Sequence, residues 1–225
     1  MKLSILAVLS AATLAASAPA NPGLGGAPLT LARLQYEGGG DWYGNPSSLS
    51  NLARAIREGT VLEVEPREMV VTLDAADLWV YPYLYMTGHG NVRLSDEQVI
   101  VLRRYLENGG FLHADDNYGM DTSFRREMTR VFPDKPLVDV PLEHAVYHVV
   151  YEFPRGVPKI HEHDGKPAQG LGIFIAGRLA VYYSYQTDLG DGWEDPDVHK
   201  DPPAKRQEAL RMGVNLFTYA VTAVR

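Results

Sequence analysis

The sequence contains no cysteine among its 225 residues. The protein therefore has no disulfide bond to stabilise it outside the cell and no thiolate to serve as a nucleophile. It also lacks the cysteine on which a lipoprotein anchor is built. Its stability has to come from a hydrophobic core, and 45% hydrophobic residues in a chain of this length suit one globular domain.

Basic residues are also scarce. The chain has 21 Lys and Arg against 28 Asp and Glu, a formal net charge of −7. An acidic chain without a basic stripe is not expected to bind nucleic acid. The glycine-rich stretches "GLGGAP" and "GGGDWYG" lack the lysine of a phosphate-binding loop, and no Gly-x-Ser-x-Gly elbow is present.

Hydrophobic runs long enough to cross a membrane are missing, and one shorter run stands near the start. Lys2 precedes an apolar run from Leu3 to about Ala16, and Ala18-Pro19-Ala20 follows as a small-x-small cleavage pattern. This layout predicts a secretory signal peptide, because the run is short for a membrane span. We therefore expect an exported protein, periplasmic or secreted, with no transmembrane segment once the signal is removed. The predicted organisation is a signal peptide at 1–20, a short segment at 21–28 and a single domain at 29–225.

Strands and helices alternate through the first 130 residues. Strands are predicted at 29–36, 61–66, 76–86 and 110–114, and helices at 49–59, 95–109 and 121–133. Ser47 or Ser48 suits the cap of the first helix, and Ser95 with Gln98 forms a capping box for the second. This alternation predicts an α/β fold in which helices cover both faces of a parallel sheet.

The C-terminal part of the chain differs from this pattern. Residues 170–187 predict a hairpin that turns at Ala176-Gly177. Residues 203–224 predict the longest helix, whose apolar stripe faces the sheet. The stripe consists of Leu210, Val214, Phe217 and Val221.

The most polar loops follow predicted strands. Ligands of parallel sheets bind outside the carboxyl ends of the strands, so we expect these loops to meet at one edge. The residues expected to line a single cleft there are Asp41, His89, Asp115 and Trp193.

Several long blocks are similar to a known family. "GGGDWYGNPSSLSNL", "YPYLYMTGHGN", "GGFLHADDNYGMDTSFRRE", "PKIHEHDGKPAQG" and "TDLGDGWEDP" resemble an uncharacterised bacterial family, domain-of-unknown-function family 4159, over about residues 29–222. That family is similar in fold to class I glutamine amidotransferases and trehalose-utilisation-type proteins. The resemblance implies a three-layer flavodoxin-like domain and no particular activity. Because Ala114 and Asp115 stand where amidotransferases carry their cysteine, cysteine-dependent amidotransferase chemistry is excluded.

The first candidate site is "HADDNY". Its His113, Asp115 and Asp116, with His89, are candidate catalytic residues for acid–base or metal chemistry. Asn117 and Tyr118 are candidate ligand-binding residues. Strand alternation turns the two carboxylates to opposite sides, so we expect Asp115 to serve a ligand and Asp116 to serve the fold. The alternative is a hydrogen-bonded core histidine beside carboxylates that accept loop amides.

The second candidate is "HEHDG". His161, His163 and Asp164 are candidate ligands for a divalent metal, and a zinc site would need a further ligand, such as His89 or His113. The alternative is a loop held by hydrogen bonds.

The third candidate combines aromatic and acidic residues. Trp42, Tyr43 and Trp193 could stack on a sugar, while Asp41, Asp188 and Asp191 bind its hydroxyl groups. The two later aspartates could also hold calcium. The alternative is that the aromatic rings cover the core beneath long loops.

Three functions remain open from the sequence. The protein could bind a small polar ligand, such as a carbohydrate or a cell-envelope fragment. It could be a metal-assisted or acid–base hydrolase. It could also be an envelope interaction module without catalysis.

Overall fold

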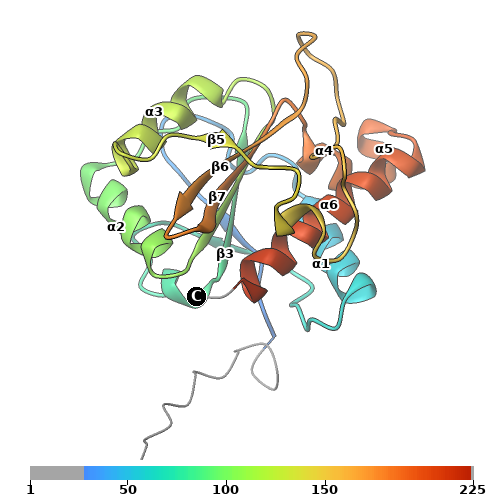
Figure 1. Ribbon diagram of the computed structural model, residues 1–225, viewed down its shortest axis with the longest axis horizontal. Helices are drawn as coiled ribbons and strands as arrows, with labels where there is room; N and C mark the ends of the chain where they lie inside the picture. Colours follow the sequence, from blue (N-terminus) through green and yellow to red (C-terminus); the bar gives the residue numbers. More distant parts are fainter. Residues whose placement is uncertain (1–27, 224–225) are drawn as a thin grey trace, which may run out of the picture.

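The computed structural model describes residues 28–223, which fold into an α/β structure around one seven-stranded sheet (Figure 1). The strand order is β2-β1-β3-β4-β7-β6-β5. The strands from β2 to β7 in that order run parallel, while β6 is antiparallel to both of its neighbours. The strands are β1 (Ala32–Leu34), β2 (Met69–Val71), β3 (Tyr83–Gly88), β4 (Phe111–Asp116), β5 (Val138–Asp139), β6 (Gln169–Ile175) and β7 (Arg178–Tyr185).

Helices lie on both faces of this sheet. In Figure 1, α2 and α3, coloured green, cover one face, and α1 and α6 cover the other. The helices are α1 (Ser48–Gly59), α2 (Asp96–Glu107), α3 (Asp121–Val131), α4 (Leu189–Trp193), α5 (Pro196–His199) and α6 (Pro203–Thr222), with 3-10 helices η1 (Leu78–Val80) and η2 (Ala145–Tyr147). Within residues 28–223, no helix is both long and apolar enough to cross a membrane.

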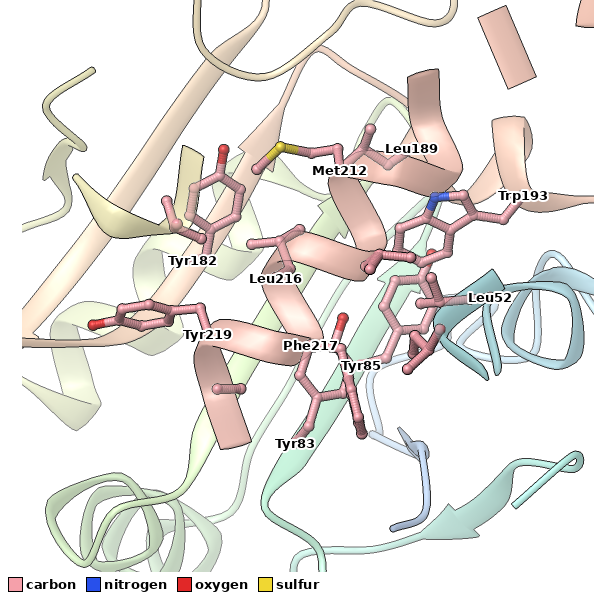
Figure 2. Close-up of a cluster of buried hydrophobic side chains, with 14 of the residues drawn as sticks. Leu52, Tyr83, Tyr85, Tyr182, Leu189, Trp193, Met212, Leu216, Phe217 and Tyr219 are labelled. Carbon is pink, nitrogen blue, oxygen red and sulfur yellow. The ribbon is translucent and has the colours of Figure 1, made fainter. Parts of the chain in front are cut away.

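The sheet separates two hydrophobic clusters, because successive side chains of a strand point to opposite faces. Along β3, Tyr83 and Tyr85 join the cluster beneath α1 and α6, whereas Leu84 and Met86 join the cluster beneath α2 and α3. Figure 2 shows the first cluster, in which residues of α6 pack against the tyrosines of β3 and against Trp193 of α4.

Several local predictions are confirmed. Ser95 and Gln98 form the predicted capping box of α2. Helix α3 begins at Asp121 and ends before Pro133. Strands β6 and β7 form the predicted hairpin, and Ala176 and Gly177 at its turn both have positive φ.

The predicted strand at 61–66 was wrong in extent. Within this range only Val64 forms a β-bridge, with Leu29, and regular strand pairing begins at Met69. Pro66 lacks an N–H group for a ladder, and Glu68 instead turns to pair with the buried Arg33. The chain therefore makes an excursion of a few residues before β2 begins.

The continuous strand predicted at 76–86 was also wrong. Residues Leu78–Val80 form η1, and β3 begins after Pro82, whose ring interrupts strand pairing. Trp79 and Val80 are 51% and 70% exposed, so an apolar run does not by itself establish a buried strand.

The predicted cap of α1 also differs. The Ser47 side chain makes no capping bond to its own helix. Glu194 accepts hydrogen bonds from both the N–H and the hydroxyl of Ser47, so the cap comes from the far end of the chain. The predicted signal peptide lies outside the described residues.

Candidate functional site

The carboxyl ends of β1, β3, β4 and β7 lie at one edge of the sheet, because these four strands run parallel. The loops after them meet there, together with the segment that carries His161 and His163. We call this edge the rim. Direct hydrogen bonds join residues from all of these loops.

Asp41 and His89 form a pair at the rim. The Asp41 carboxylate accepts the His89 backbone N–H at 2.5 Å and lies 2.9 Å from its ring Nδ1. Burial alone would raise the pKa of Asp41, but the hydrogen bonds from His89 hold it below its usual value. Gly88 permits this geometry, because a Cβ there would lie 2.2 Å from the Tyr36 hydroxyl.

Two asparagines connect the loops after β1 and β4. The Asn117 amide nitrogen donates to Asn45 Oδ1 at 3.2 Å. The Asn45 amide nitrogen donates to Asp191 Oδ1 at 2.9 Å, which joins these loops to α4. Asn45 has a left-handed backbone, so its position is fixed by the fold around it.

His161 lies between two carboxylates. Its Nδ1 is 2.9 Å from Asp191 Oδ2, and its Nε2 is 3.0 Å from Asp201 Oδ2. The hydrogen bond to Asp191, together with the charges of both carboxylates, raises the pKa of His161 to about 9. The ring is therefore a charged imidazolium at neutral pH.

Asp188 is the centre of a second set of contacts. His163 Nε2 bonds to its Oδ2, and His161 Nδ1 lies 3.6 Å from the same oxygen. Burial raises the pKa of Asp188 to about 6. Its other oxygen, Oδ1, is buried and has no hydrogen-bond partner among the described residues. The Tyr118 ring stacks on His163 with 4.4 Å between centroids, which fixes the imidazole plane.

Ligand-type atoms of His161, Asp191 and His199 lie within 4.8 Å of one another. His199 Nε2 is 3.7 Å from Asp191 Oδ1, and the centroids of the His161 and His199 rings are 5.2 Å apart. Zinc ligands at about 2.1 Å in a tetrahedral arrangement are about 3.4 Å apart. The distances from Asp191 to the two histidines are 2.9 Å from its Oδ2 and 3.7 Å from its Oδ1, one on either side of that value. The three groups are therefore close enough to be candidate ligands of one metal ion.

The sequence matches the family model DUF4159, described as "Domain of unknown function (DUF4159)", over residues 30–221. The chain belongs to this family. No curated protein matched it. The match covers the rim and both core clusters, so the site described above lies within the matched region.

The sequence-predicted residues fall into two groups. The rim brings together Asp41, His89, Asn117, Tyr118, His161, His163, Asp188 and Asp191. The remaining candidates lie elsewhere, for different physical reasons.

His113 lies in the core rather than at the rim. Its Nδ1 is 2.8 Å from the Tyr83 hydroxyl and its Nε2 is 2.8 Å from the Ser184 hydroxyl, so both nitrogens are engaged. Burial lowers the pKa of His113 to about 3, which keeps the ring neutral. It is the hydrogen-bonded core histidine of the alternative reading.

Asp115 is fully buried and surrounded by donors. It accepts the backbone N–H of Gly190 at 2.7 Å, that of Leu189 at 3.2 Å and the Ser184 hydroxyl at 2.5 Å. Burial raises the pKa of Asp115 to about 7. The expectation that it serves a ligand directly needs correction, because its carboxylate holds the first turn of α4 and has no exposed surface.

Asp116 points to the opposite face of the sheet, as alternation predicts. It accepts the backbone N–H of Met120 at 3.0 Å and so fixes the turn into α3. Burial raises its pKa as well. Asp115 and Asp116 are adjacent in sequence, yet they position two different helices, α4 and α3.

Trp193 does not line a cleft. Its ring is fully buried in the cluster of Figure 2, and its Nε1 donates to the Ala209 carbonyl at 2.8 Å. Trp42 is partly buried against the other cluster, whereas its neighbour Tyr43 is 64% exposed. Two of the three aromatic candidates thus cover the core, and Tyr43 keeps an open face.

Asp164 does not belong to the group of His161, Asp191 and His199. It lies 2.9 Å from Lys166 in an exposed ion pair. Sequence reasoning missed Asn45, His199 and Asp201. The last two stand in "DPDVHKDPP", an acidic stretch with a histidine, which was the available signal.

Proposed function

We propose that this protein binds a divalent transition-metal ion through His161, Asp191 and His199 and uses it to hydrolyse a small polar substrate at the rim. One observation carries the proposal: ligand-type atoms of these three side chains lie within 4.8 Å of one another at the carboxyl ends of the parallel strands. Two imidazoles and one carboxylate form a donor set that suits zinc and manganese.

The surroundings of the three groups support a metal site over a plain ion pair. An ion would replace the Nδ1 proton that faces Asp191, while the Nε2–H still donates to Asp201, and metal-bound histidines usually donate their second N–H to a carboxylate. Asp191 is fixed in turn by the Asn45 amide. Both ligands are therefore oriented by neighbours, which a metal centre requires.

The rim also supplies a candidate acid–base group. Asp41 holds Nδ1 of His89, and Nε2 of that ring has no hydrogen-bond partner within residues 28–223. An oriented histidine with one free nitrogen suits proton transfer. A divalent ion supplies polarisation of a substrate carbonyl or phosphoryl group and activation of water. Asn117 and the exposed face of Tyr118 would contact the polar substrate.

Two broader assignments belong to the proposal. The strand order β2-β1-β3-β4 supports a flavodoxin-like domain of the amidotransferase-like kind. The apolar run of residues 3–16 supports export, so the substrate would be a carbohydrate or envelope fragment outside the cytoplasm.

The test is hydrolysis of chromogenic phosphate esters, carboxylic esters and glycosides by chelator-treated protein before and after zinc or manganese is added. We expect added metal to restore activity against one class, and Asp191→Asn and His199→Ala to abolish it. Asp134→Asn, at an exposed position, is the matched control. Activity that survives the chelator and both variants would contradict the proposal. Metal binding without turnover of any class would favour a binding protein over a hydrolase.

A further inference from the structure

The cluster at the rim contains more ligand-type groups than one metal ion uses. Three histidines and three aspartates are linked in it: His161, His163, His199, Asp188, Asp191 and Asp201. A catalytic ion takes three protein ligands and keeps an open position. With His161, Asp191 and His199 assigned to that ion and Asp201 orienting His161, the pair His163 and Asp188 is left over.

Asp188 has the properties of a carboxylate shared between two ions. Its Oδ2 contacts His163 and lies 3.6 Å from His161 Nδ1, so it stands between the two histidines. Its Oδ1 is buried without a partner in the described part of the chain, although the residue is only 1% exposed. An unpaired buried carboxylate oxygen is costly unless something binds it.

The backbone at Asp188 points the same way. Its φ is +56°, a left-handed conformation, and Gln186 two residues earlier has φ +61°. Neither residue is glycine, and non-glycine residues in this conformation gather at ligand clamps. The Asp188 side chain lies toward both histidines.

We propose that the rim holds a second divalent ion that would take the place of the direct contact between His163 and Asp188, with the Asp188 carboxylate bridging the two ions. This inference rests on the proposed function only in that the first ion lies at His161, Asp191 and His199. Ions that share a carboxylate in this way are about 3.5–4 Å apart. The stack of Tyr118 on His163 keeps the imidazole Nε2 directed at the bridging carboxylate.

The two ions differ in affinity. The first has three protein side chains of its own, whereas the second has His163 and a share of Asp188, with solvent or substrate filling its remaining positions. The second ion therefore binds more weakly and exchanges faster. Together the two ions would stabilise the attacking and the leaving oxygen of a hydrolysed substrate, so the pair suits phosphate or carboxyl compounds.

The test counts ions on the full chain after chelator treatment, using manganese titrated in a calorimeter and elemental analysis after desalting. We expect two ions per chain, one tight and one weaker. His163→Ala should keep the tight ion and lose the weaker one, and His199→Ala should weaken the tight ion at least tenfold. His148→Ala, which changes a partly exposed histidine outside the cluster, is the control and should bind two ions.

The outcomes separate the two proposals. One ion in the native protein, unchanged in His163→Ala, would overturn the second site and leave the proposed function standing. No ion in any variant would overturn both. Electron paramagnetic resonance covers the case in which His163→Ala does not fold: native protein with two manganese ions should give a spin-coupled spectrum, and two uncoupled signals would overturn the bridge.

Discussion

At the scale of single residues, the neighbours of a carboxyl group decide what it does. Asp115 lies in β4 and Asp191 in α4, and the donors around Asp115 are backbone N–H groups and a buried hydroxyl. The neighbours of Asp191 are two histidines and an amide. The first environment positions a helix, and the second suits an ion.

Ser184 connects two buried groups, because its hydroxyl donates to Asp115 at 2.5 Å and lies 2.8 Å from His113 Nε2. In Ser184→Ala, Asp115 and His113 Nε2 both lose the hydrogen bond to this hydroxyl. The free energy of unfolding should therefore fall by about 1–3 kcal/mol. Urea denaturation at pH 7 measures this. Thr129→Ala at an exposed helix position should change it by less than about 0.5 kcal/mol. Equal stability of Ser184→Ala and native protein would contradict the assigned network.

The His161 ring gives the metal-free protein a pH-dependent stability. Its folded pKa is raised to about 9 from 6.5 by Asp191 and Asp201. The contribution of the charged ring is therefore fully present below about pH 6.5 and is lost as the pH rises through about 9. The difference in melting temperature between native protein and His161→Gln, both with chelator, should shrink from pH 6.5 to 9.5. A difference in melting temperature that does not change with pH would mean that the ion pairs of His161 contribute nothing to stability.

Part of the site could be predicted from the sequence. The spacing of His161 and His163 marked a ligand-type pair, and alternation separated Asp115 from Asp116. The identity of the partners could not be predicted, because His199 and Asp201 reach the rim only through the path of α5. The local sequence also does not show how deeply the end of a strand is buried, so His113 and Asp115 were expected at the surface.

At the scale of elements, α4 is the helix that places the site. It is five residues long, follows the strained Asp188 and carries Asp191. Its first turn packs so closely on the sheet that a Cβ at Gly190 would lie 2.2 Å from the Tyr85 hydroxyl and 2.6 Å from the Asn45 amide nitrogen. A glycine is therefore needed for α4 to reach its position.

Gly190→Ala should displace α4 and lower stability by about 1–3 kcal/mol through overpacking. It should also weaken zinc binding, because Asp188 and Asp191 move with the helix. Gly90→Ala at the same rim is the control, since its Cβ would meet its nearest neighbour at 3.5 Å, an ordinary contact. Thermal melts and zinc titrations of both variants measure the effects. Native zinc affinity in Gly190→Ala would show that α4 does not position the ligands.

Elements with strong local signals were predicted well. The capping box of α2 and the positive-φ turn of the β6–β7 hairpin follow from the residues at those positions. The strand expected at 76–86 failed because Pro82 divides an apolar run whose first half is a 3-10 helix. Hydrophobicity alone does not distinguish a buried strand from an exposed apolar turn.

At the scale of the whole molecule, the parallel sheet explains why distant segments meet. Four parallel strands end at one edge, so loops more than a hundred residues apart, such as those of Asn45 and Asp191, are bonded to each other. The alternation of strands and helices predicted this edge. It did not predict that the segment of His161 would lie over α4, which is fixed by contacts such as Ile160 N–H to the Thr187 carbonyl.

Export is the prediction that concerns the chain as a whole. The charged start, the apolar run and the Ala18-Pro19-Ala20 pattern predict removal of residues 1–20. Mass spectrometry of protein from its native host should find a mature N-terminus near Asn21. An intact Met1 on protein from the soluble cytoplasmic fraction would rule out export.

The central claim is that the rim is a metal centre, and X-ray diffraction from crystals soaked in zinc at the zinc absorption edge tests it most directly. An anomalous difference peak is expected within about 2.3 Å of His161, Asp191 and His199 together. The peak should be absent in crystals of Asp191→Asn. Native crystals at saturating zinc that show no peak there, with His161 still hydrogen-bonded between Asp191 and Asp201, would contradict the account.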